Sequence, residues 1–259
     1  YSNLDYGIQV TTTGVGNRIA GNSIDGRNDE NYGVYINAGD RNVISNNAIF
    51  GHTWAGVVIF STATQNIVVG NILRSNRNSG VVFSGPGVNE SRIVSNRIDG
   101  RSIQTQGIVL EFANRNIVSN NSVHHHRLDG IQIRNTSRSN GLYANRVYSN
   151  SRMGIALTNA GPSRNRVVRN LVYANTAAGI HLANGTNTYV LNNTLALNAG
   201  GGVRIGAVAG ISNRFVNNLL QSNGSRGVTN AAAGTRWQFN DVFGHAANYA
   251  NSTALAVSN

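Results

Sequence analysis

The chain is built from a repeat of about 25 residues. In each repeat an Asn stands five residues after another polar residue, and aliphatic residues lie between and after the two. The repeat Asn residues are Asn22, Asn47, Asn71, Asn96, Asn121, Asn145, Asn170, Asn193, Asn218 and Asn240, at steps of 22 to 25 residues. A period of this length is typical of solenoid proteins, in which each repeat forms one turn of the molecule.

Within a repeat, apolar and polar residues alternate with a period of two, as in a β-strand. Short alternating runs bounded by Gly, Asn and Ser predict strands and turns, and clusters of Gly and Asn interrupt every segment long enough for a helix. Strands of adjacent repeats would then stack in parallel. The sequence predicts an all-β fold, a single-stranded right-handed parallel β-helix of about ten coils with 22–25 residues per coil.

Two columns of inward-facing residues follow from this register. One column lies three residues before the repeat Asn and the other two residues after it, and all twenty residues are apolar. The repeat Asn occupies the corner between the two columns. Because a buried amide has to be hydrogen-bonded, we expect the Asn side chains to form an internal ladder along the axis.

The unbroken period predicts one elongated domain over residues 1–259. Regular coils are expected over about residues 6–243 and an irregular Ala/Asn/Ser-rich tail over residues 244–259. Neither end carries a capping segment, and solenoids need capped ends to stay soluble. The sequence therefore predicts part of a longer chain or a unit that self-associates through uncapped ends. No apolar stretch is long enough for a membrane span.

The charge balance favours an anionic partner. The chain has 21 basic residues, all arginine, against 10 acidic residues, a formal net charge of +11. The planar fork of arginine suits carboxylate, sulfate and phosphate. Four residues before the repeat Asn, half of the ten positions are arginine: Arg18, Arg92, Arg166, Arg214 and Arg236. The alternative is a solvated face that prevents lateral association. Nucleic acid is a poor candidate, since no nucleic-acid-binding motif is present.

The repeat resembles that of a known fold family. Its Asn-x-(Ile/Val) and Gly-(Ile/Val)-x-(Ile/Leu) segments, such as Gly130-Ile131-Gln132-Ile133, are similar to the right-handed parallel β-helix repeat of pectate-lyase-like proteins. Within them, the group of mannuronan C5-epimerases, NosD-like proteins and bacterial cell-surface proteins is the most similar. The resemblance spans Tyr6 to about Val242. It implies a secreted, periplasmic or cell-surface protein that binds or cleaves polysaccharide, although fold alone does not fix chemistry.

The catalytic motifs of these relatives are missing from the sequence. Alginate epimerases carry an Asp-Pro-His element, whereas Pro86 and Pro162 both follow Gly and precede Gly or Ser. The Asn-Thr-Asp and Gly-His-Gly elements of polygalacturonase-like hydrolases are also missing. The ten acidic residues are too widely spread for the calcium site of pectate lyases. We therefore expect no metal and no cofactor, and the motifs leave open whether the protein is an enzyme.

One outward column combines groups that could process a uronic acid. Three residues after the repeat Asn, successive coils carry Asp99, His124, Tyr148 and Tyr173, flanked by Arg97 and Arg146 one residue after it. Removal of the C5 proton needs a cation on the carboxylate, a base and an acid. In a catalytic site His124 would be the base, Tyr148 the acid and Arg97 or Arg146 the carboxylate partner. Asp99 would orient the imidazole.

Further residues complete the predicted binding surface. Tyr173, Arg74, His126 and Arg127 would contact the glycan near this column, and Arg92, Arg166 and Arg214 along the arginine column. The predicted function is binding of an extended anionic polysaccharide. The alternatives are a metal-independent polysaccharide lyase or uronate C5-epimerase, and a spacer, adhesin stalk or stacking filament unit without a ligand. Adjacent His residues in a turn could bind a metal, but they rarely converge without a third ligand.

A second outward face is strongly apolar. Val57, Val58, Ile59 and Phe60 follow one another, and the equivalent positions of neighbouring coils are also Val. An exposed strip of this kind is normally covered, so we expect a loop, a neighbouring domain or a second copy to lie over it.

Overall fold

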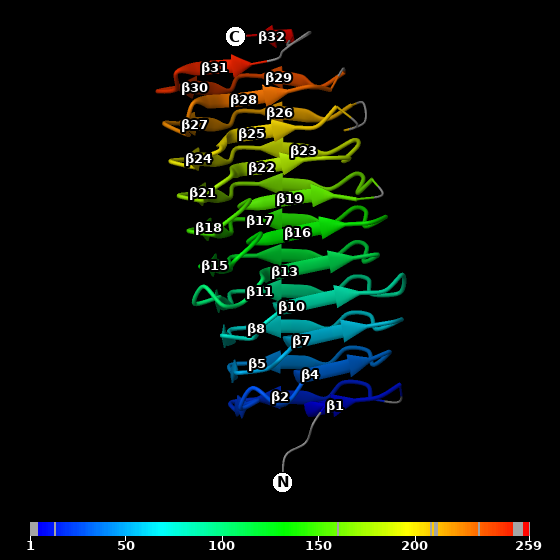
Figure 1. Cartoon of the computed structure of the whole chain (residues 1–259). Coiled ribbons are helices and arrows are strands. Elements are labelled where there is room, and N and C mark those ends of the chain that lie inside the picture. The colour runs from blue at the N-terminus through cyan, green and yellow to red at the C-terminus, as the bar shows by residue number, and fades with distance from the viewer. Residues whose placement is uncertain are drawn as a thin grey trace.

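The chain forms a right-handed parallel β-helix with three strands in each coil (Figure 1). The computed structural model describes residues 5–12, 14–159, 161–207, 209, 212–232, 234–250 and 256–258. Every described strand pairs in parallel with its equivalent one coil away, as between β12 (Arg97–Asp99) and β15 (Ser122–His124). The predicted all-β class, the parallel β-helix and the coil count are confirmed.

Three sheets run along the axis, and we name them A, B and C. Sheet A contains β1 (Tyr6–Val10), β4 (Tyr32–Asn37), β7 (Ala55–Phe60), β10 (Ser79–Ser84), β13 (Gln106–Glu111), β16 (Ile131–Arg134), β19 (Ile155–Thr158), β22 (Ala178–Leu182), β25 (Gly201–Ile205), β28 (Arg226–Asn230) and β31 (Ala247–Ala250). Sheet B contains β2 (Arg18–Ala20), β5 (Val43–Ser45), β8 (Ile67–Val69), β11 (Arg92–Val94), β14 (Ile117–Ser119), β17 (Gly141–Tyr143), β20 (Arg166–Val168), β23 (Tyr189–Leu191), β26 (Arg214–Val216), β29 (Arg236–Gln238) and β32 (Ala256–Ser258). Sheet C contains β3 (Ser23–Asp25), β6 (Ala48–Phe50), β9 (Ile72–Arg74), β12, β15, β18 (Arg146–Tyr148), β21 (Leu171–Tyr173), β24 (Thr194–Ala196), β27 (Leu219–Gln221) and β30 (Asp241–Phe243).

The hydrophobic core fills the inside of the coils. All twenty residues of the two predicted inward columns are buried, and sheet A adds residues such as Val81 and Phe83. Near the C-terminal end the rings of Phe215 and Trp237 stack in the core with centroids 4.2 Å apart. The stacked aliphatic residues are mostly β-branched or Leu, which suits pleated strands.

The predicted Asn ladder is present at the corner between sheets B and C. Asn145 is typical of it: its backbone N–H and its side-chain amide both donate to Oδ1 of Asn170, at 2.9 and 3.0 Å. The same amide donates to the carbonyl of Val118, and Oδ1 of Asn145 accepts from Asn121. Each side chain therefore satisfies the turn of a neighbouring coil, which stabilises the corner.

A further ladder, not predicted from the sequence, lies five residues after the first in most coils; Gln104, eight residues after Asn96, takes this place in its coil. It is a column of buried polar residues: His52, Asn76, Gln104, His126, Asn150, Asn175, Asn198 and Asn223. Asn175, for example, donates to Oδ1 of Asn198 at 2.8 Å. This column closes the corner between sheets C and A, and it determines where His126 lies.

The prediction for the C-terminal segment needs correction. Residues 244–259, predicted to be an irregular tail, contain β31 and β32, which extend sheets A and B. Tyr249 of β31 packs against the core and contacts Trp237, so the coil pattern continues with Tyr249 in place of the usual aliphatic residue.

The apolar strip of sheet A is largely covered by the chain itself. Val58, Val82 and Val109 are only 1–2% exposed, and Tyr32 and Tyr35 pack against this cluster. The expected covering by another element is therefore not required for these valines.

No helix in the described part of the chain is long and apolar enough to cross a membrane.

Candidate functional site

The outer face of sheet C carries the column predicted from the repeat. The strand register pairs Asp99 with His124, His124 with Tyr148, and Tyr148 with Tyr173, so the four residues lie on four successive coils. We call these four residues the site column. Because every coil contributes the same strand position, the shared offset from the ladder Asn was sufficient to predict this alignment.

The aromatic members of the site column stack on one another. The rings of His124 and Tyr148 have centroids 4.7 Å apart, and those of Tyr148 and Tyr173 lie 4.9 Å apart with planes 7° from parallel. These distances match the spacing of neighbouring strands. The inner ring faces cover each other, so the column presents ring edges and hydroxyl groups to solvent. A sugar ring would therefore meet polar groups here and not a flat aromatic platform.

Arg146 lies beside this stack and is held by it. Its Nε and Nη2 donate to the hydroxyl oxygen of Tyr173 at 2.8 and 2.5 Å, and its guanidinium lies 5.0 Å from the ring centroid of Tyr148. Arg97 is exposed two coils away in the same column of sheet C. Among the described residues neither arginine forms an ion pair with a carboxylate. The guanidinium of Arg146 is thus ordered but its charge is not neutralised.

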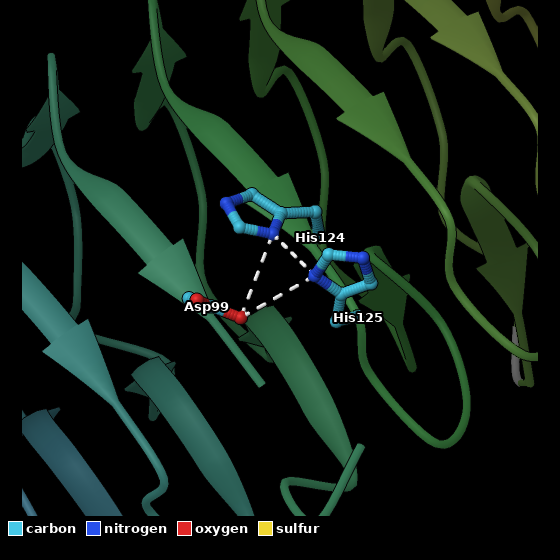
Figure 2. A group of neighbouring side chains, drawn as sticks. All are labelled: Asp99, His124 and His125. Carbon is cyan, nitrogen blue, oxygen red and sulfur yellow. Dashed lines mark hydrogen bonds and ion pairs between the residues drawn. The ribbon is translucent and has the colours of Figure 1, made fainter. Parts of the chain in front are cut away.

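Asp99, His124 and His125 meet at the lower end of the site column (Figure 2). The Nδ1 atoms of the two imidazoles are 2.9 Å apart, and each lies 3.5 Å from Oδ1 of Asp99. Within the described residues these three side chains form a group with the spacing of metal ligands. His124 is almost fully buried, whereas His125 is exposed.

The charge states of this group follow from its surroundings. Burial is the largest cause that lowers the pKa of His124; the Asp99 carboxylate opposes it, and the charges of His125, Arg97 and Arg146 add to it. Burial raises the pKa of Asp99, but the Arg101 backbone hydrogen bond and the two imidazoles together hold it below its usual value. The site therefore combines an ionised carboxylate with an imidazole that favours its neutral form.

His126 does not reach the surface. It is fully buried in the polar ladder between sheets C and A, where burial lowers its pKa to about 3. The prediction that His126 contacts a glycan is wrong, because three consecutive His residues at a corner cannot all face outward. His125 takes the surface position instead, and the sequence prediction did not include it among the site residues.

The signal for His125 lies in the backbone of the repeat. His125, Ser149 and Ala174 occupy the same position after the sheet C strand and all have φ between 53° and 58°. This left-handed conformation turns the chain so that the side chains of His124 and His125 lie together. Because different residue types adopt this conformation on successive coils, the alternation of polar and apolar residues alone does not reveal it.

The remaining predicted residues are distributed over separate surfaces. Arg74 lies one coil below Asp99 in the same column and stacks over Phe50, 4.7 Å from its centroid. Arg127 lines a hollow beside Trp54 and Arg77, at the turn that leads to sheet A. The structure thus keeps Arg74 with the site column and separates Arg127 from it.

Arg92, Arg166 and Arg214 belong to sheet B and are exposed. Arg166 and Arg214 lie on either side of the Tyr189 ring, 6.0 and 5.8 Å from its centroid. Tyr189 and Arg166 also line a shallow hollow with Tyr143 and Arg164. Sheet B therefore carries a second basic surface, distinct from the site column.

Comparison with known proteins identifies the family. The right-handed β-helix region family matches residues 1–104 and 97–242. The chain belongs to this family. A sequence search of curated proteins finds no match.

Several solved β-helix structures share the fold. The periplasmic alginate epimerase AlgG is 21% identical over 73% of this chain and 47% of its own, with a TM-score of 0.65. The Dettilon tailspike protein is 21% identical over 96% of this chain and 54% of its own, with a TM-score of 0.78. The A-module of the Azotobacter vinelandii mannuronan C-5 epimerase AlgE4 is 13% identical over 98% of this chain and 79% of its own, with a TM-score of 0.76. The chain spans about half the length of AlgG and of the tailspike protein.

Proposed function

We propose that this β-helix binds an extended anionic polysaccharide along the outer face of sheet C. The observation that carries the proposal is Arg146, whose guanidinium is fixed by two hydrogen bonds to Tyr173 while its charge has no carboxylate partner among the described residues. An arginine ordered by neutral groups keeps its donors and its charge for an external anion, and a planar guanidinium suits a carboxylate.

The shape of the face agrees with an extended ligand. The site column repeats at the coil spacing over four coils, with Arg97 and Arg146 on alternate coils beside it. A linear polyanion lying along the axis would meet hydroxyl groups and guanidinium groups in turn. The net charge of +11 would draw such a ligand to the surface from a distance. The arginines of sheet B would contribute to this long-range attraction from a separate face.

Relatives with the same fold lend support to a glycan ligand. One of the solved structures is described as a periplasmic alginate epimerase and another as a mannuronan C-5 epimerase. The proposed location is accordingly secreted, periplasmic or at the cell surface.

The test is affinity electrophoresis in gels that contain alginate, pectate, hyaluronan or a sulfated glycan. At low ionic strength the wild type should be retarded by at least one acidic glycan, and the double variant Arg97→Glu/Arg146→Glu should not. Arg18→Glu/Arg236→Glu changes the net charge equally on exposed sheet B positions and serves as the matched control. Absence of retardation in the wild type would rule out a specific binding surface on sheet C. An equal loss of retardation in the sheet C and sheet B double variants would do the same.

A second candidate function is a uronate C5-epimerase or polysaccharide lyase at the same face. It is favoured by the lowered pKa of His124, because a base in proton abstraction has to be neutral. Tyr148 contacts this imidazole and would be the acid, with Arg146 on the carboxylate. The low exposure of His124 argues for a binding role instead. Incubation with polyuronates distinguishes catalysis from binding alone. NMR would detect C5 inversion by an epimerase, and ultraviolet absorbance would detect the unsaturated ends made by a lyase.

The remaining alternative is a spacer, stalk or stacking unit without a glycan ligand. Sedimentation velocity over a range of protein concentrations would detect end-to-end association. Association without retention on any acidic glycan would favour this alternative over the proposed function.

A further inference from the structure

Three potential ligand atoms face one point at the lower end of the site column. They are Oδ1 of Asp99 and the Nδ1 atoms of His124 and His125, separated by 2.9, 3.5 and 3.5 Å (Figure 2). No metal site was predicted from the sequence, because two adjacent His residues lack a third ligand. The parallel register supplies that ligand from the preceding coil, since Asp99 of β12 pairs with His124 of β15.

The fold holds these side chains in place. His124 is 3% exposed and packs against the ring of Tyr148. Oδ1 of Asp99 also accepts a hydrogen bond from the backbone N–H of Arg101 at 3.1 Å, which orients the carboxylate. The positive φ of His125 brings its imidazole to the same side as that of its neighbour. Hydrogen bonds from outside a ligand set are typical of metal sites, where they orient the ligands.

The tautomers of the two imidazoles decide what these atoms can bind. One proton between the two Nδ1 atoms makes a hydrogen bond at 2.9 Å, whereas with the protons on Nε2 both Nδ1 atoms present lone pairs. The carboxylate oxygen lies 3.5 Å from both, longer than a normal hydrogen bond of about 2.7–3.2 Å. A metal ion bound by the two Nδ1 atoms and Oδ1 would replace the shared proton, which leaves to solvent.

The spacing fits a small transition-metal ion. Three atoms at these separations lie on a circle with a radius of about 1.9 Å, and zinc–nitrogen bonds measure about 2.0–2.1 Å. An ion slightly above the plane of the three atoms would reach all of them at bonding distance. Two imidazoles with one carboxylate favour zinc and similar ions, whereas calcium and magnesium prefer oxygen ligands alone.

We infer that Asp99, His124 and His125 form a three-ligand site for a divalent transition-metal ion of the zinc class. Such a site leaves a fourth position for water or a ligand oxygen, as in catalytic zinc sites. The positive charges of Arg97 and Arg146 disfavour a bare cation nearby, and an anion in the fourth position would offset them. The site does not depend on the proposed glycan function, since either could exist without the other.

The test uses tag-free protein, stripped of metal with a chelator and titrated with zinc chloride in a calorimeter. The expected result is one Zn²⁺ per chain in a saturable isotherm. His125→Ala and Asp99→Asn should each weaken binding at least tenfold. His181→Ala removes a partly buried His of sheet A and should leave binding unchanged.

A second set of measurements distinguishes loss of metal binding from loss of structure in the variants. Co²⁺ in place of Zn²⁺ should give the visible absorption of a low-coordinate site in the wild type and in His181→Ala, but not in His125→Ala. Circular dichroism should show the same β-structure in all of them. Absence of saturable binding in the wild type, or binding in His125→Ala and Asp99→Asn as tight as in the wild type, would overturn the inference and leave a hydrogen-bonded cluster.

Discussion

The ring of Tyr148 lies parallel to that of Tyr173 on the next coil, with centroids 4.9 Å apart. Arg146 spans both rings and donates to the hydroxyl of Tyr173. The coil repeat thus builds an ordered cationic group from Arg146 and Tyr148 of one coil and Tyr173 of the next, which is 25 positions after Tyr148 in sequence. The proposed glycan surface depends on the contact of Arg146 with these two tyrosines. Substitutions at these surface positions can remove the contact without changing the hydrophobic core.

Tyr173→Phe should weaken binding to an acidic glycan by about two- to tenfold, equivalent to the loss of about 0.5–1.5 kcal/mol. The substitution keeps the ring stack and removes the hydroxyl that holds Arg146. Titration calorimetry with an oligosaccharide of the glycan that retards the wild type provides the measurement. Tyr189→Phe, on sheet B between two arginines, is the matched control and should bind as the wild type does. Equal affinities of Tyr173→Phe and the wild type would show that the hydroxyl does not position Arg146 for binding.

Asn145→Leu should lower the free energy of unfolding by about 1–3 kcal/mol, because Leu removes the hydrogen bonds that the Asn121 N–H and the Val118 carbonyl of the preceding coil make to the Asn145 side chain. Urea denaturation followed by circular dichroism measures the change. The same substitution at Asn22, an exposed ladder residue of the first coil, should cost less than half as much. A loss at Asn145 no larger than that at Asn22 would contradict a stabilising role for the buried ladder.

His52→Asn should make the protein less sensitive to acid. Burial lowers the pKa of His52, against the hydrogen bond to Asn76 and the charge of Asp25, which raise it. As the pH falls below about 6.5, the unfolded chain binds the proton before the folded protein does, so the wild type loses stability. Asn is the residue found at this ladder position in coils such as those of Asn150 and Asn175, and it does not titrate.

Urea denaturation at pH 7 and pH 5 tests this directly. The free energy of unfolding should fall less between the two pH values in His52→Asn than in the wild type. An equal fall in the two proteins would show that His52 makes no contribution to acid sensitivity.

The repeat Asn made most of the fold predictable. Two fixed offsets identified the inward columns, and a third placed Asp99, His124, Tyr148 and Tyr173 on successive coils, because equivalent residues of stacked parallel strands lie at equivalent positions. The second buried polar column could also have been predicted, since Asn76, Asn150 and Asn175 follow the ladder Asn by five residues. It was missed because His52, Gln104 and His126 interrupt the Asn pattern.

The details of the site could not be obtained in this way. Which of three consecutive His residues faces outward depends on the left-handed turn at His125, a backbone feature without a fixed residue type on other coils. The contact between Arg146 and Tyr173 depends on side-chain conformations that the register allows but does not impose. The strands beyond Phe243 were missed because aromatic and small residues replace the aliphatic pattern there.

The proposed function requires sheet C to bind the anionic groups of a polysaccharide. The most direct measurement is calorimetric titration of the wild type with acidic oligosaccharides, in parallel with the same oligosaccharides after reduction of their carboxylates to alcohols. The expected result is saturable binding of at least one acidic oligosaccharide, weakening with added salt, and no binding of its neutral counterpart. Equal binding of both forms, or binding of neither across alginate, pectate and hyaluronan fragments, would contradict the claim.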